Sequence, residues 1–130
     1  FLIFPWNEKK YVQKQVETLS IKCAGINQYV SALSGGNKQK VVFGKWIGRG
    51  SDVLILDCPT RGVDIGVKQA MYRLMYQMKK EGKSIVIISE ELTELIGMSD
   101  RLMIMKDGKI MHEFPRSESL SEADAIQYMI

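Results

Sequence analysis

The spacing of apolar residues along the chain predicts two amphipathic helices. Apolar side chains recur every three or four residues over residues 8–19 and over 67–78. A further helix is expected over about 36–47, between a candidate N-cap at Ser34 and the glycines at 48 and 50. The segment 67–78 has the clearest pattern, because valine, leucine and methionine share one face while lysine, arginine and glutamine occupy the other. We expect its methionines to pack in a core, since flexible thioether side chains fill irregular apolar gaps.

Two apolar segments predict strands of a parallel sheet. Residues 53–57 form the first, and residues 84–89 form the second. The second shows little alternation of apolar and polar residues, so we expect this strand to be covered on both faces. A strand, a helix and another strand in this order imply a parallel βαβ unit. A short helix is expected next, over about residues 91–96.

The C-terminal part of the chain predicts a hairpin and one more helix. Residues 101–105 and 110–114 flank an Asp-Gly pair at 107–108, which is typical of a tight hairpin turn. Ser121 is followed three residues later by Asp124, in the pattern of a capping box. We expect a short helix to begin there and to run to the C-terminus.

Length and composition restrict the class of protein. With 130 residues and 45% hydrophobic content, the chain suits one domain with a real core. Its net charge of +3 is spread without a long run of one sign, so charge does not support a role on nucleic acid or on a membrane surface. Cys23 and Cys58 lack a paired or metal-type spacing and predict reduced thiols. The chain starts without methionine on a short apolar segment, and we expect it to be a piece of a longer protein.

Residues 33–40, with the sequence Leu-Ser-Gly-Gly-Asn-Lys-Gln-Lys, carry the strongest chemical signal. Ser34 is a candidate N-cap, and the glycines after it leave backbone amides open at a helix start, where the helix dipole favours phosphate. Asp57 closes an apolar strand, where its carboxylate could hold magnesium. Taken singly, the serine segment is an ordinary cap and turn, and the aspartate is an ordinary loop cap. Together they predict half of an ATP site.

Three segments in this order give the chain a family resemblance. Residues 33–40, 54–57 and 59–64 look like the nucleotide-binding cassette of an ABC transporter. The amino-acid sequences of these segments and of residues 97–101 most resemble the second cassette of the tandem-cassette ATPases that energise bacterial sugar importers of the ribose, galactose and xylose type. The resemblance covers nearly all of residues 8–114.

The resemblance implies an α/β fold, namely a partial P-loop NTPase fold with a parallel sheet flanked by helices and a C-terminal antiparallel hairpin. The strand that carries the phosphate loop is lacking, which would leave a gap after the strand at 84–89. Residues 1–50 would form part of the helical signature subdomain, and residues 51–130 the C-terminal part of the ATPase core. Open sheet edges of this kind favour a homodimer of the chain.

The resemblance also implies roles for individual residues. Residues 33–40, called the signature segment below, would contact an ATP molecule that is held by a second cassette. The contacting residues would be Ser34, Gly35, Gly36 and Asn37. Asp57 would position Mg²⁺, and Asp64 would touch the partner cassette. Further partners would be the membrane subunits of the transporter, and the location would be peripheral, at the cytoplasmic face of the inner membrane.

Three departures from the family pattern limit the expected activity. The glycine-rich phosphate loop (Walker A) is missing, because Gly82-Lys83-Ser84 precedes a strand where the true loop follows one. Cys58 stands at the usual position of the catalytic glutamate, and a thiol is a poor general base for water. It could equally be a small residue buried at a strand end. Glu90 stands at the usual position of a histidine, and an ionised carboxylate would repel a phosphate.

These departures predict an asymmetric ATPase. The site with Asp57, Cys58 and Glu90 would turn over nucleotide slowly or not at all, while the intact signature segment would complete a competent site on the partner cassette. We expect the chain alone to be inactive. Two alternatives stay open: a non-catalytic regulatory or dimerisation cassette, and a soluble ABC ATPase of translation or repair.

Overall fold

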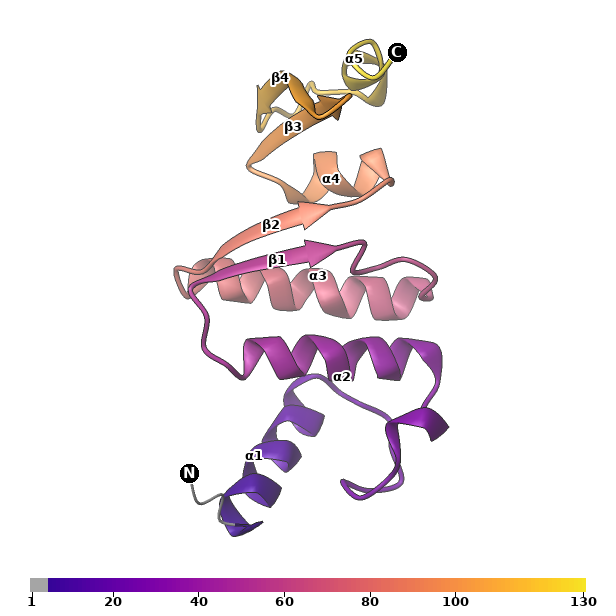
Figure 1. Cartoon of the computed structure of the whole chain (residues 1–130), viewed down its shortest axis with the longest axis vertical. Coiled ribbons are helices and arrows are strands. Elements are labelled where there is room, and N and C mark those ends of the chain that lie inside the picture. The colour runs from indigo at the N-terminus through magenta and orange to yellow at the C-terminus, as the bar shows by residue number, and fades with distance from the viewer. Residues whose placement is uncertain (1–4) are drawn as a thin grey trace. The chain divides into compact units, whose positions relative to one another are not determined.

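The computed structural model describes residues 5–130, so the first four residues lie outside it (Figure 1). Contacts divide the chain into two compact units, one ending at Val86 and the other running from Ile87 to Ile130. The division predicted near residue 50 stays a prediction. Among the described residues, no helix is both long enough and apolar enough to cross a membrane.

The first unit contains the predicted βαβ arrangement. Its strands β1 and β2 pair side by side in a parallel sheet, and α3 connects them along the chain, which confirms the predicted α/β class. In order, its elements are α1 (Pro5–Thr18), a 3₁₀ turn η1 (Val30–Ala32), α2 (Gly35–Ile47), β1 (Val53–Asp57), α3 (Ile65–Lys80) and the first part of β2 (Ser84–Ile88), whose last two residues belong to the second unit. Figure 1 shows α2 and α3 as neighbouring helices on one side of the strands.

The core of the first unit lies along α3. Met71, Met75 and Met78 are buried on one face of this helix, as the methionine pattern predicts. The other buried apolar residues of this unit come from β1, from α2 and from the positions that directly follow α1 and η1: Leu19, Leu33, Phe43, Leu54 and Leu56. The core therefore joins α2, α3 and the inner face of β1.

The opposite face of the strand pair is open, contrary to the expectation that the second strand is covered on both faces. Val86 and Ile88 of β2 are exposed, and so are Val53 and Ile55 of β1, the latter at 71%. Apolar composition predicted coverage, but the residues alternate in burial because only one face packs on the core. Composition cannot tell which segment covers a strand.

Close contact between α1 and α2 depends on two glycines. A Cβ on Gly44 would lie 2.5 Å from Cδ1 of Leu19, and a Cβ on Gly48 would collide with the Tyr11 hydroxyl. Gly44 and Leu19 are both buried. The α2 backbone can thus approach the end of α1 only where no side chain intervenes.

The second unit pairs a hairpin with two short helices. Its elements are α4 (Leu92–Met98), β3 (Arg101–Lys106), β4 (Lys109–Pro115) and α5 (Glu122–Ile126). The hairpin is antiparallel, as predicted, and its turn residues Asp107 and Gly108 both have positive φ. An irregularity between Ile104 and Met105 shifts the register. Leu102, Ile104 and Ala125 form the buried cluster of this unit.

A capping box begins α5, as predicted, although the helix ends at Ile126 and does not reach the C-terminus. The amide of Asp124 donates to the hydroxyl oxygen of Ser121 at 3.3 Å, and the amide of Ser121 donates to the Asp124 carboxylate at 2.9 Å. Hydrogen bonds from the side chain and then the backbone of Ser121 lower the pKa of Asp124 from its ordinary value.

Candidate functional site

The signature segment forms the start of α2, and its serine is held in a way that the sequence does not predict. Ser34 occupies the N-cap position with extended backbone, but its side chain does not cap the helix. Its hydroxyl oxygen accepts a hydrogen bond of 2.8 Å from Nδ2 of Asn37. Oδ1 of Asn37 also accepts from the amide of Lys22 at 2.9 Å. Asn37 thereby fixes both the serine and the preceding loop, while the first turn of α2 lacks a side-chain cap.

The two glycines of the segment have different surroundings. Gly35 is exposed, and a Cβ built on it would meet nothing within 4 Å. A Cβ on Gly36 would lie 2.8 Å from Cγ2 of Val67, in the first turn of α3. Gly36 is therefore needed for packing between two helix starts, whereas the backbone at Gly35 is accessible from outside. An uncapped and accessible helix start is suited to an anion such as phosphate.

Asp57 and Asp64 mark the two ends of the turn between β1 and α3. Asp57 is the last residue of β1 and is exposed. Asp64 is the N-cap of α3, where its Oδ1 accepts from the amide of Val67 at 2.9 Å. Val67 thus contacts both Gly36 and Asp64: its side chain packs on Gly36 at the start of α2, and its amide donates to Asp64 at the start of α3.

The donor set around Asp57 suits only one kind of magnesium site. Within residues 5–130, no three side chains of histidine, cysteine, aspartate or glutamate gather closely enough to hold a metal ion. Mg²⁺ is commonly bound through one or two carboxylates together with substrate phosphates and water. The single carboxylate of Asp57 therefore fits a magnesium ion that arrives with a nucleotide, and does not fit a resident ion.

Cys58 has a strained backbone. Its φ is +43°, in the left-handed region that side chains rarely occupy, and its carbonyl accepts from the amide of Arg61 at 3.2 Å to close the turn. For an L-residue this conformation costs about 1–2 kcal/mol. Neither Cys58 nor Cys23 forms a disulfide in this structure, and their reduced state stays a prediction.

We expect Cys58→Gly to be more stable than Cys58→Ala by about 1 kcal/mol in the free energy of unfolding. Both variants lose the sulfur atom, but only glycine adopts a φ of +43° without a clash between Cβ and the backbone, and this gain exceeds the extra entropy of an unfolded glycine. Urea unfolding followed by circular dichroism measures the difference. An alanine variant of equal or greater stability would show that the turn relaxes without cost.

Glu90 lies in the second unit, in the link between β2 and α4. The hydroxyl of Ser89 donates to Oε2 of Glu94 at 2.8 Å and accepts from the amide of Glu91 at 3.1 Å. Glu94 is only 8% exposed, and Glu90 itself is exposed. The residues on either side of Glu90 are therefore tied to the start of α4. Sequence reasoning did not find Glu94, because a glutamate in a short amphipathic helix is normally solvated.

The segment Gly82-Lys83-Ser84 has a structural role, in agreement with its rejection as a phosphate loop. Gly82 has φ +83° just after α3, and Ser84 opens β2 by donating its amide to the carbonyl of Asp52 at 2.8 Å. Nζ of Lys83 lies 3.1 Å from Oδ1 of Asp52 and 3.2 Å from the carbonyl of Gly50. The lysine thus fastens the start of β1 to the start of β2.

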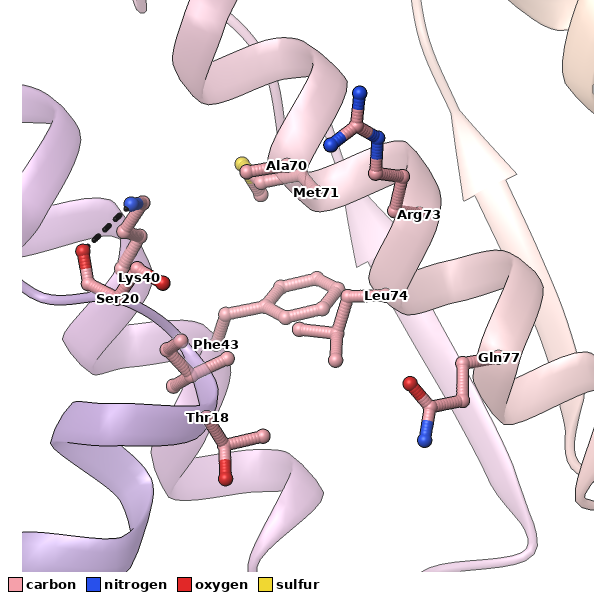
Figure 2. A pocket seen from close by; sticks show the side chains of 10 residues that line it. Thr18, Ser20, Lys40, Phe43, Ala70, Met71, Arg73, Leu74 and Gln77 are labelled. Carbon is pink, nitrogen blue, oxygen red and sulfur yellow. Dashed lines mark hydrogen bonds between the residues drawn. The ribbon is translucent and has the colours of Figure 1, made fainter.

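A cavity of about 220 Å³ lies between the end of α1 and the middle parts of α2 and α3. Figure 2 shows Phe43 and Leu74 directed toward each other across it and Nζ of Lys40 bonded to the carbonyl of Ser20. None of the predicted site residues lines it. Lys40, the last residue of the segment 33–40, lines the cavity, whereas the residues at the start of that segment do not.

Comparisons with known proteins identify close relatives. The chain is 46% identical over 121 residues to the ribose import ATP-binding protein RbsA of Shouchella clausii, covering 93% of this chain and 24% of that protein. It is 45% identical over 115 residues to the protein of the same name from Bacillus subtilis, covering 88% and 23%. The chain thus spans about a quarter of the length of these relatives. No family model matches it.

Solved structures share the fold. The chain superposes with a TM-score of 0.79 and 18% identity on the dimeric ATP-binding cassette MJ0796 bound to ADP and Pi, covering 90% of this chain and 50% of that one. With the ABC transporter cassette MJ1267 the TM-score is 0.81 and the identity 22%, covering 100% of this chain and 53% of that one. At these identities the likeness concerns the fold alone.

Proposed function

Because this chain belongs to the ATP-binding cassette family and resembles its sugar-import members, we propose that it forms part of the ATPase of a bacterial sugar importer. In this proposal it supplies the signature segment at the start of α2 and the magnesium aspartate at the end of β1. Both segments lie in the first unit. Their task is to couple ATP hydrolysis to sugar uptake.

One observation carries the proposal, namely the state of the first turn of α2. Ser34 is in place to cap this turn but does not, and its hydroxyl oxygen accepts a hydrogen bond from Asn37. The exposed Gly35 leaves room for a ligand to reach the backbone. Backbone amides at a helix start, together with the helix dipole, bind phosphate oxygens. The γ-phosphate of an ATP molecule held by a second cassette is the ligand we assign to them.

The asymmetry expected from the sequence is part of the proposal. Cys58 offers no carboxylate to polarise an attacking water, and the loss of such a group typically costs about 10²–10⁴-fold in rate. Glu90 places a carboxylate where phosphate would be repelled. The main contribution of this chain is therefore to the nucleotide site of the partner cassette, and its own Asp57 holds magnesium at a slow site.

The partners follow from the same assignment. A second cassette provides the phosphate loop opposite the signature segment, and membrane subunits of the importer provide the path for the sugar. The chain would then lie at the cytoplasmic face of the membrane, bound through those subunits. The open apolar face of β1 and β2 also favours self-association when other segments do not cover it.

Titration of the chain with MgATP in a calorimeter tests the proposal. We expect no saturable heat at millimolar nucleotide, because backbone amides at one helix start cannot hold ATP without a phosphate loop. A complete sugar-import ATP-binding protein, which carries both kinds of segment, is the positive control. Saturable one-to-one binding to the chain alone would contradict the assignment, since it would require a phosphate-binding loop within these residues.

A further inference from the structure

A side-chain hydrogen bond joins the start of α2 to the turn after β1. Nε2 of Gln39 donates to the carbonyl oxygen of Pro59 at 2.8 Å, between residues that are 20 positions apart in the sequence. The bond is partly buried, and Pro59 itself is buried. Gln39 lies one helical turn after the exposed Gly35, while Pro59 directly follows Cys58. The bond thus connects the two segments that the sequence assigns to nucleotide chemistry.

A second contact fixes the other end of the same turn. Gly36 packs directly on Val67, whose amide is bonded to Asp64. The turn from β1 to α3 is therefore attached to α2 at two places, near Pro59 by a hydrogen bond and near Val67 by close packing. Because the turn contacts the same helix at both Pro59 and Val67, it cannot pivot about one contact without breaking the other.

The energetics of the two attachments differ. The packing contact is non-directional, whereas a hydrogen bond requires a short distance and a near-linear geometry. Removing Gln39's amide would leave the carbonyl of a buried residue without this donor, which costs more than the bond itself is worth. The hydrogen bond from Gln39 is therefore more sensitive to a small displacement of the turn than the packing at Gly36 is.

We propose that Gln39 is a positioning residue that couples the magnesium-aspartate turn to the phosphate-binding start of α2. Displacement of the backbone at Cys58 moves Pro59, and the hydrogen bond transmits this movement to the first turn of α2. In the proposed function, on which this inference rests, the two segments serve different nucleotide sites. Gln39 then links the state of one site to the geometry of the other within a single chain.

Nuclear magnetic resonance of the ¹⁵N-labelled chain tests the coupling in a double-mutant design. Cys58→Gly removes the Cβ that restricts the backbone at this strained position, so the turn is free to adjust, and this change serves as the perturbation. The amide signals of Gly35 and Gly36 serve as reporters. Gln39→Met keeps the length of the side chain but removes the donor. We expect Cys58→Gly to shift the reporter signals in the native background, and the shift to fall at least about twofold in the Gln39→Met background.

Two further variants complete the design. Gln69→Met makes the same change at an exposed position of α3 and should leave the reporter shifts as they are in the native background. Gln39→Glu keeps the shape but replaces the donor by oxygen, and should act like Gln39→Met even if the latter folds poorly. Reporter shifts that are absent in the native background, or that persist in both Gln39 variants, would overturn the proposal. Because no nucleotide is used, this outcome is independent of the MgATP titration.

Discussion

Replacing Met71 with alanine is expected to lower the free energy of unfolding of the first unit by about 2–5 kcal/mol. Met71 is 2% exposed and lies on the inner face of α3 with Met75 and Met78. Alanine loses the buried thioether side chain and leaves a cavity that the surrounding helices can only partly fill. Urea unfolding, followed by far-ultraviolet circular dichroism, measures the loss from the shift of the midpoint.

Met105→Ala is the matched control for this change. Met105 is 64% exposed on β3, so the same truncation removes little buried surface and is expected to change stability by less than about 0.5 kcal/mol. Equal losses at the two positions would show that α3 does not form the core of the first unit. A loss at Met71 alone is the expected result.

Gly35→Asp is expected to lower ATP turnover of the complete ATPase by about 10²–10³-fold while leaving the fold intact. A Cβ at this position would meet nothing within 4 Å, and an acidic residue in the first turn of a helix is favoured by the helix dipole. The same carboxylate would repel the γ-phosphate and remove a preorganised donor site, for which losses of this size are typical. Steady-state phosphate release measures turnover, and thermal unfolding measures stability.

Gly35→Asn distinguishes the effect of the added charge on turnover from the effect of the added side-chain volume. Asparagine has nearly the shape of aspartate but no charge, so its effect on turnover should be clearly smaller. Unchanged turnover in the aspartate variant would show that the signature segment does not contact the nucleotide. Loss of folding in that variant would contradict the open surroundings of Gly35.

Most elements could be predicted because their signals are local. The helical spacing of the methionines on α3, the Asp-Gly turn of the hairpin and the capping box at Ser121 each depend on residues close together in the chain. For the same reason the bounds of β1 and α2 were predicted within a residue or two. Local patterns determine where an element begins and what type it is.

The features that were missed depend on contacts between distant residues. The hydroxyl of Ser34 does not cap α2, because Asn37 competes for it and is itself held by Lys22. Gln39 belongs to the signature octapeptide, but its bond to Pro59 crosses between elements and has no local pattern. The positive φ of Cys58 is likewise set by the turn around it. Local chemistry marked Ser34 as a candidate N-cap and the family resemblance marked Cys58, but neither assigned these contacts.

The link between β2 and α4 restricts how the carboxylate of Glu90 can move. Ser89 before it and Glu91 after it are joined by one hydrogen bond, and Ser89 is also held by the buried Glu94. The backbone of Glu90 thus spans a very short closed loop. Its carboxylate can move by rotation about the side-chain torsions, but hardly by a swing of the main chain. Under the proposed function, a nucleotide near Glu90 would therefore meet a carboxylate whose backbone is held in place and whose side chain can rotate.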